Sequence, residues 1–168
     1  HLEENLQNIN NNFNVCIGHS RWATHGGKTD ENSHPHESCD GSIVIVHNGI
    51  ISNFKELKNK YIPNWELKSE TDTEVVANLI QYYKEQGFEM LKILEILTNE
   101  MIGTWAFLIH DNTTNDSRDK MYFMKNENPM LIGNCDGLKI LTSEPSGFLN
   151  MTDKYILLRD KTYGYVDK

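Results

Sequence analysis

Runs of apolar residues predict two strands in the first third of the chain, separated by a long polar loop over residues 21–41. Asn14–Ser20 alternates apolar and polar positions, a pattern that is typical of a buried strand. Ser42–Val46 is an apolar, β-branched run and predicts the clearest strand in the protein. It is followed by His47–Gly49, where the Asn-Gly pair favours positive φ. We therefore expect the second strand to end there in a tight turn.

Helical periodicity dominates the middle of the chain. A short helix is expected from Phe54 to about Lys60, and Trp65–Ser69 has the composition of another strand. Thr71–Glu74 has the form of a capping box, with threonine as the N-cap and glutamate at N3 of a helix that stops at Gly87. A second helix is expected over Phe88–Asn99. The apolar positions predicted to be buried on these two helices are Val75, Val76, Leu79, Ile80, Tyr83, Leu91, Leu94 and Leu97.

The last third of the chain predicts a series of short strands. Their ranges are Thr104–His110, Met121–Lys125, Met130–Gly133, Leu138–Thr142, Tyr155–Leu158 and Gly164–Val166. Strands, then two adjacent helices, then more strands is not the βαβα alternation of a parallel doubly wound sheet. The order instead favours an α+β fold of antiparallel sheets with helices packed against them. No internal repeat or linker divides the sequence.

Composition and charge narrow the class of protein. The chain has 168 residues, of which 38% are hydrophobic, enough for one packed core. Its formal net charge is −8, which argues against nucleic acid or an anionic membrane as the main partner. No apolar run approaches the ~20 residues needed to span a bilayer, and no signal-peptide core opens the sequence. We therefore expect a cytoplasmic protein.

The cysteines and histidines do not form a recognisable metal or disulfide pattern. Cys16, Cys39 and Cys135 are scattered, and none has the local partner that an activated nucleophile needs. His34 and His36 are only two positions apart, with no cysteine or acidic ligand recurring at zinc-finger spacing. We predict neither a metal nor a cofactor.

Three segments carry side chains suited to chemistry. Arg21–Gly26, RWATHG, combines a guanidinium for a carboxylate, an indole wall, a hydroxyl and an imidazole. Asn48 and Gly49 offer a side-chain amide and a backbone N–H as a donor pair for an oxyanion, although a simple hairpin turn explains the same residues. Asp72 lies in the first turn of a helix, where it complements the helix dipole or presents a carboxylate to an ammonium group.

Taken together, the motifs GHSRWATHG, HPH, VHNGIISNFKELK and SETDTEVVANLI resemble one family in order and approximate spacing. It is the glutaminase domain of the glucosamine–fructose-6-phosphate aminotransferases, which are class II glutamine amidotransferases with the N-terminal-nucleophile fold. The similarity continues more weakly through Gly103–Asp111, Asn128–Gly133 and Ile140–Glu144. The resemblance implies a four-layer αββα sandwich of antiparallel sheets. It also implies that residues 1–168 are one type-2 amidotransferase domain, incomplete at its N-terminus and without the sugar-isomerase domains.

The resemblance implies a role for each matching residue. Asn48 and Gly49 would form the oxyanion hole, and Arg21 would hold the α-carboxylate of L-glutamine. Asp72 would bind the α-ammonium group. The remaining substrate-binding positions implied by the family are Trp22, Thr24, His25 and His36. The implied reaction supplies ammonia to a sugar-isomerase domain, which converts fructose 6-phosphate to glucosamine 6-phosphate in an enzyme expected to be a homo-oligomer.

One departure from the family concerns the nucleophile. The family's attacking group is a cysteine that becomes the first residue after removal of the initiator methionine, with its own α-amino group as the base. This sequence begins with His1, and its three cysteines do not match that position. Two alternatives therefore remain open beside a glutaminase. One is a catalytically silent module that binds glutamine or has a regulatory role, and the other is an amidotransferase that feeds a different acceptor.

Overall fold

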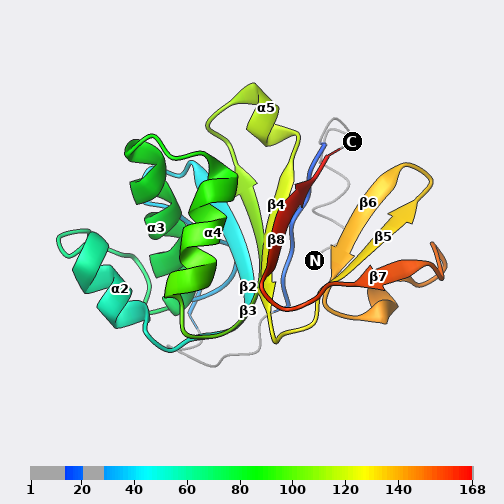
Figure 1. Ribbon diagram of the computed structural model, residues 1–168, viewed down its shortest axis with the longest axis horizontal. Coiled ribbons are helices and arrows are strands. Elements are labelled where there is room, and N and C mark those ends of the chain that lie inside the picture. The colour runs from blue at the N-terminus through cyan, green and yellow to red at the C-terminus, as the bar shows by residue number, and fades with distance from the viewer. Residues whose placement is uncertain (1–13, 21–28, 168) are drawn as a thin grey trace.

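Two antiparallel sheets face each other in the computed structural model, which describes residues 14–20 and 29–167 (Figure 1). The larger sheet has five strands in the order β1-β2-β3-β4-β8, and the smaller has three in the order β6-β5-β7. The strands are β1 (His36–Glu37), β2 (Ile43–Ile51), β3 (Gly103–Asp111), β4 (Met121–Asn126), β5 (Leu131–Cys135), β6 (Leu138–Thr142), β7 (Tyr155–Leu157) and β8 (Thr162–Val166). The helices are α2 (Phe54–Tyr61), α3 (Asp72–Glu85), α4 (Met90–Glu100), α5 (Asn115–Arg118) and the 3-10 helix η1 (Pro145–Phe148).

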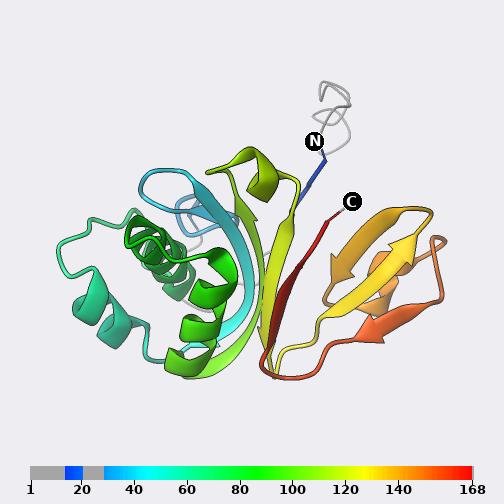
Figure 2. The ribbon, with the colours of Figure 1, turned by 45° about the horizontal axis from the view of Figure 1, so that its top comes forward.

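The elements stack in layers. Helices α2, α3 and α4 cover one face of the larger sheet, and the smaller sheet lies beyond its other face (Figures 1 and 2). The α+β class and the antiparallel pairing expected from the sequence are confirmed. Of the four expected layers, the described residues supply three. On the outer face of the smaller sheet they place only η1, whose Phe148 packs against Leu131 and Cys135.

Apolar side chains on both faces of the larger sheet form two separate cores. Side chains of a strand point to opposite faces in turn. On β3, Trp105, Phe107 and Ile109 face the helices, while Ala106 and Leu108 face the smaller sheet. The larger core is therefore the one between helices and sheet, and it includes the buried residues of α3 and α4. The space between the two sheets is enclosed by a smaller apolar cluster and holds the cavity described below.

Strand β2 runs straight through the expected turn. The prediction that the strand ends at His47–Gly49 is wrong, because Asn48 pairs with Ala106 and Gly49 with Trp105 in the β2–β3 ladder. Gly49 does adopt a positive φ of 134°, but it does so inside the strand. A Cβ at this position would lie 2.1 Å from the carbonyl oxygen of Thr104. Close approach of the neighbouring strand, and not chain reversal, therefore requires glycine at this position.

The capping prediction for α3 is confirmed at Thr71 and wrong for Glu74. The Thr71 hydroxyl accepts a hydrogen bond from the Glu74 N–H, as an N-cap does. The Glu74 carboxylate does not reach back to the N-cap residue. It accepts instead from the backbone N–H groups of Lys68 and Ser69, at 2.8 and 2.6 Å. These N–H groups are thereby used by a side chain, and the strand expected over Trp65–Ser69 does not form.

Two further expectations need correction. Residues 14–20 form no ladder with any described strand, so the expected strand Asn14–Ser20 is not present. On α4, Leu91 is 42% exposed, and the buried face consists of Met90, Ile93, Leu94 and Leu97. The buried face predicted for α3 and the remaining strands agree with the structure to within a few residues at each end. Among the described residues, no helix has the length and apolar character required to cross a membrane.

Candidate active site

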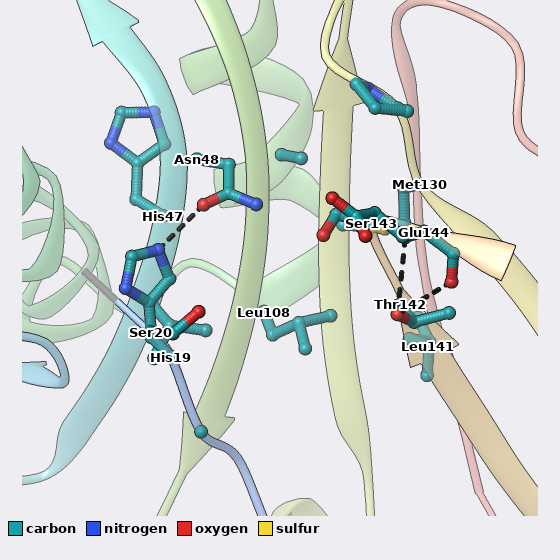
Figure 3. Close-up of a pocket in the computed structure, with 14 residues that line it drawn as sticks. His19, Ser20, His47, Asn48, Leu108, Met130, Leu141, Thr142, Ser143 and Glu144 are labelled. Carbon is teal, nitrogen blue, oxygen red and sulfur yellow. Dashed lines mark hydrogen bonds between the residues drawn. The ribbon is translucent and has the colours of Figure 1, made fainter. Parts of the chain in front are cut away.

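A cavity of about 350 Å³ lies between the two sheets (Figure 3). One wall comes from the larger sheet and includes Val46, Asn48 and Leu108. The opposite wall includes Met130 and the polar run Thr142–Glu144, which follows from the end of β6. Residues Gly18–Ser20 contribute a third side. The volume suits a small polar metabolite such as an amino acid.

The pleat of β2 separates the two neighbours His47 and Asn48. Asn48 points into the cavity, while His47 points to the helix side of the sheet (Figure 3). The His47 ring is stacked on Phe107 with 4.0 Å between centroids, and its Nδ1 lies 3.0 Å from the Thr73 hydroxyl on α3. Burial lowers the pKa of His47 to about 4, against an opposing effect of the nearby Asp72 carboxylate. This histidine is therefore neutral at physiological pH.

The orientation of the Asn48 side chain is set by His19. Nε2 of His19 lies 2.7 Å from Oδ1 of Asn48. A carbonyl oxygen can only accept, so the imidazole supplies the proton of this hydrogen bond. The Nδ2 group of Asn48 is then left as a donor that faces across the cavity toward the Thr142–Glu144 wall (Figure 3).

The N-terminus of α3 is tied to the larger sheet by consecutive residues. Thr71 bonds His36 on β1, with its hydroxyl 3.1 Å from Nε2. Asp72 accepts from the backbone N–H of Ile51 on β2 at 2.7 Å. With Thr73 bonded to His47, each residue of this first turn holds a different point of the sheet. These contacts give Asp72 a structural role at the start of the helix, and its binding of an ammonium group stays a prediction.

The predicted site residues differ in whether they line the cavity. Asp72 and His36 are 5% and 4% exposed, and neither lines the cavity. Asn48 does line it, and Gly49 follows directly on β2. The predicted positions Arg21, Trp22, Thr24 and His25 lie outside the described residues. Their roles, with those of Asp72 and His36, therefore stay predictions.

None of the three thiols lines the cavity, and all three belong to the described residues. Cys39 lies beside Glu66 near the start of β2, where burial and the Glu74 carboxylate raise the pKa of its thiol. Cys135 is buried under η1, and Cys16 lies in the segment before the cavity wall. None of these three thiols is therefore placed to attack a molecule bound in the cavity.

Three histidines of the described residues, His19, His34 and His36, lie close together. The rings of His19 and His34 are 4.3 Å apart, and those of His34 and His36 are 5.0 Å apart. Within residues 14–20 and 29–167, no group of three or more possible ligands has the arrangement that a metal ion needs.

Sequence reasoning missed two parts of the site. The pattern of residues 14–20 predicts a strand and no role for His19, although His19 lies just before RWATHG and belongs to the same motif. The wall Thr142–Glu144 was recognised only as a weak family match. Its signal was the polar run that follows directly on an apolar strand, where loop residues often carry function.

The fold and the site define a class. A family model of the glutamine amidotransferase domain matches residues 5–161, and this chain belongs to that family. It is 37% identical over 154 residues to the glutamine–fructose-6-phosphate aminotransferase (isomerizing) of Staphylococcus aureus strain Mu50, covering 92% of this chain and 25% of the relative. The enzyme of the same name from Bacillus subtilis strain 168 is 39% identical over 145 residues, which cover 86% of this chain and 24% of the relative. The chain thus spans about a quarter of the length of the curated relatives it matches.

Solved structures share the fold. Glutamine phosphoribosylpyrophosphate amidotransferase from Bacillus subtilis superposes with a TM-score of 0.61 at 22% identity, covering 89% of this chain and 34% of that one. A predicted glutamine amidotransferase from Pseudomonas aeruginosa gives a TM-score of 0.59 at 16% identity, covering 82% of this chain and 63% of that one. At these identities the likeness shows the fold alone, and it agrees with the α+β arrangement of antiparallel sheets expected from the sequence.

Proposed function

We propose that this chain supplies the glutamine pocket and the oxyanion hole of a domain that hydrolyses L-glutamine and provides the ammonia within a larger aminotransferase. The observation that carries the proposal is the Asn48–Gly49 pair. The amide of Asn48 is oriented as a donor into a cavity of amino-acid size, and the backbone N–H of Gly49 is the next donor along the strand. Two donors on a rigid central strand are suited to stabilising charge that develops on one oxygen atom.

The reaction would proceed by acyl transfer. A thiolate attacks the side-chain carboxamide carbon of glutamine, and the carbonyl oxygen becomes an oxyanion that accepts hydrogen bonds from Asn48 and Gly49. The leaving nitrogen takes up the proton that the thiol gave up, and collapse of this intermediate breaks the carbon–nitrogen bond and releases ammonia, leaving a γ-glutamyl thioester. Water then hydrolyses the thioester to glutamate and regenerates the thiol. Each oxyanion donor typically contributes a factor of about 10²–10³ to kcat.

The attacking thiol would belong to a residue that precedes His1 in the full-length polypeptide. Cys16, Cys39 and Cys135 lie away from the cavity, which supports this placement. Residues 1–168 would then be most of one type-2 amidotransferase domain.

Opposite charges would fix the amino-acid end of the substrate. Arg21 would pair with the α-carboxylate and Asp72 with the α-ammonium group. Trp22 would close one wall, with Thr24, His25 and His36 nearby. Paired charges at one end and aimed donors at the other hold the reacting carbonyl in place, which lowers the entropic part of the barrier.

The acceptor would be a sugar phosphate. The curated relatives are named as glutamine–fructose-6-phosphate aminotransferases, and the identity of 37–39% extends over most of this chain. We therefore propose that the ammonia passes to a sugar-isomerase domain of the same enzyme, which makes glucosamine 6-phosphate from fructose 6-phosphate. The assembly would be a homo-oligomer in the cytoplasm.

The test uses the full-length protein that contains this chain. Ammonia release from glutamine and covalent labelling by a glutamine-analogue diazoketone are measured with and without fructose 6-phosphate. The proposal expects both, with hexosamine phosphate formed only when the sugar phosphate is present. Ammonia release and labelling without sugar amination would reject the acceptor and keep the glutaminase. Absence of both would reject the glutaminase.

The catalytically silent alternative is favoured by one observation, the absence of a thiol from the cavity wall in a chain whose cysteines are all described. Titration calorimetry separates a glutamine sensor from a domain without a ligand. A sensor binds glutamine but releases no ammonia and resists the diazoketone.

A further inference from the structure

Asn128 lies in the connection between β4 and β5. It contacts Asn48 on β2, which is 80 residues away in sequence. Its side-chain Nδ2 donates to the backbone carbonyl oxygen of Asn48 at 2.6 Å. A Cβ built on Gly49 would lie 2.7 Å from the same nitrogen. The amide of Asn128 thus fills the space that a side chain at position 49 would occupy, and it is in contact with the peptide that joins Asn48 to Gly49.

The geometry of a trans peptide links this contact to the proposed oxyanion donor. In a planar trans unit, the carbonyl and the N–H point in opposite directions. Among the described residues, the cis bond is His34–Pro35, so the Asn48–Gly49 peptide is trans. Holding the Asn48 carbonyl toward Asn128 therefore directs the Gly49 N–H to the opposite side. Gly49 has a φ of 134° and no Cβ. Its own backbone therefore does little to restrain the orientation of this peptide.

The turn that carries Asn128 is itself fixed. Glu127 has a positive φ of 63°, and its N–H donates to the Asp160 carboxylate at 2.8 Å. The N–H of Asn128 donates to the carbonyl oxygen of Asn126 at 2.8 Å. Asp160 also pairs with Lys125 on β4. Asn128 does not line the cavity, so it holds the peptide from outside the space that a substrate would fill.

We propose that Asn128 is a positioning residue, which aims the Gly49 N–H at the oxyanion by fixing the Asn48–Gly49 peptide. The inference rests on the proposed oxyanion role of that peptide. A donor that is present but poorly aligned contributes little to a transition state, because hydrogen bonds weaken steeply as their angle departs from linear. Asn128 would therefore affect kcat and not the binding of glutamine.

The test compares Asn128→Ala and Asn128→Asp with a matched control in the full-length protein. Asp keeps the shape of Asn but turns the donor into a second acceptor facing a carbonyl oxygen. The proposal expects kcat for glutamine hydrolysis to fall about tenfold or more in both variants, at an unchanged KM. A role in packing alone would leave Asn128→Asp near wild type, and that result would overturn the proposal.

The control is Asn126→Ala. Asn126 Nδ2 donates to the carbonyl oxygen of Gly103 at 3.0 Å, the same kind of bond from an amide side chain to a backbone carbonyl, but between β4 and β3 and not to Asn48. Asn126→Ala is expected to keep kcat within about twofold of wild type. If its kcat falls as far as that of Asn128→Ala, general loosening of the strands explains both and the positioning role is rejected.

A second readout does not depend on activity. Asn48–Gly49 is the one Asn-Gly pair within residues 1–168, so ¹³C′-asparagine with ¹⁵N-glycine labelling of the full-length protein gives one signal from this part of it, identified by its loss in Asn48→Ala. Its signal is expected to shift in Asn128→Ala and to stay in place in Asn126→Ala. If wild type releases no ammonia but the signal shifts, the proposed function fails while Asn128 still holds the peptide. An unshifted signal in Asn128→Ala overturns the inference itself.

Discussion

Nε2 of His19 lies 2.7 Å from Oδ1 of Asn48, a contact that joins the segment before the RWATHG motif to the central strand β2. This single hydrogen bond decides which end of the Asn48 amide faces the cavity. If the amide rotated by half a turn, an oxygen would replace the donor, and it would repel a developing oxyanion. His19 is thus expected to act on the reaction through Asn48.

Replacing His19 tests this relationship. His19→Ala is expected to lower kcat for glutamine hydrolysis by about tenfold, because the Asn48 amide loses the partner that selects its orientation. His19→Gln keeps an N–H donor and should restore part of the loss. Steady-state kinetics with His110→Ala as a control measures the effect, since His110 lies at the far end of β3 and bonds the backbone carbonyl oxygen of Arg118 on α5. Equal losses in the Ala and Gln variants would contradict the orienting role.

Gly49→Ala tests the close approach of β2 and β3. The added Cβ would meet the Thr104 carbonyl at 2.1 Å at a φ of 134°, so we expect a loss of more than about 3 kcal/mol in the free energy of unfolding. Gly137→Ala is the matched control. Its φ is 87°, but no atom lies within 4 Å, so only the backbone strain of about 1–2 kcal/mol applies. Urea denaturation measures both, and similar losses would refute the steric account.

Burial of His47 predicts a pH dependence of stability. The folded pKa of about 4 lies below the ordinary 6.5, so the unfolded chain binds more protons between these values. The contribution of His47 is therefore fully present above pH 6.5 and is lost as pH falls toward 4, by roughly 1.4 kcal/mol per pH unit. In His47→Gln this part of the slope should vanish. Unfolding free energies at several pH values measure it, and parallel curves for the two proteins would contradict the prediction.

Substitutions at Asp72 distinguish a structural role of its carboxylate from a role in binding glutamine. Its carboxylate accepts from the Ile51 N–H, and Asn can still accept there, so Asp72→Asn should unfold within about 1 kcal/mol of wild type. If the charge also holds the α-ammonium group of glutamine, KM should rise at least tenfold in this variant. Asp72→Ala removes the acceptor and should in addition cost about 1–3 kcal/mol of stability. An unchanged KM in Asp72→Asn would exclude Asp72 from the binding site.

The features that the sequence predicts correctly depend on residues that are close together in the chain. The Thr71 cap and the apolar face of α3 depend on residues a few positions apart, so their pattern is visible in the sequence. The Asn48–Gly49 pair shows the opposite case. An Asn-Gly dipeptide normally marks a turn, and only the partner strand β3, more than fifty residues away, holds it in a ladder.

The candidate site divides in the same way. The family resemblance of its motif predicts a role for Asn48, whereas the residue types alone are explained equally well by a turn. The contacts that orient it come from His19 and Asn128, which are 29 and 80 residues away, and no periodicity links them to β2. The expected strand Trp65–Ser69 failed for a related reason, since the Glu74 carboxylate occupies backbone donors that a ladder would use.

The most direct measurement is kcat for glutamine hydrolysis by the Asn48→Ala variant of the full-length protein. If Asn48 stabilises the oxyanion, kcat should fall by about 10²–10³ while KM changes little, because the donor acts in the transition state and not on the bound substrate. A kcat within about twofold of wild type would contradict the assignment of this strand as the oxyanion hole.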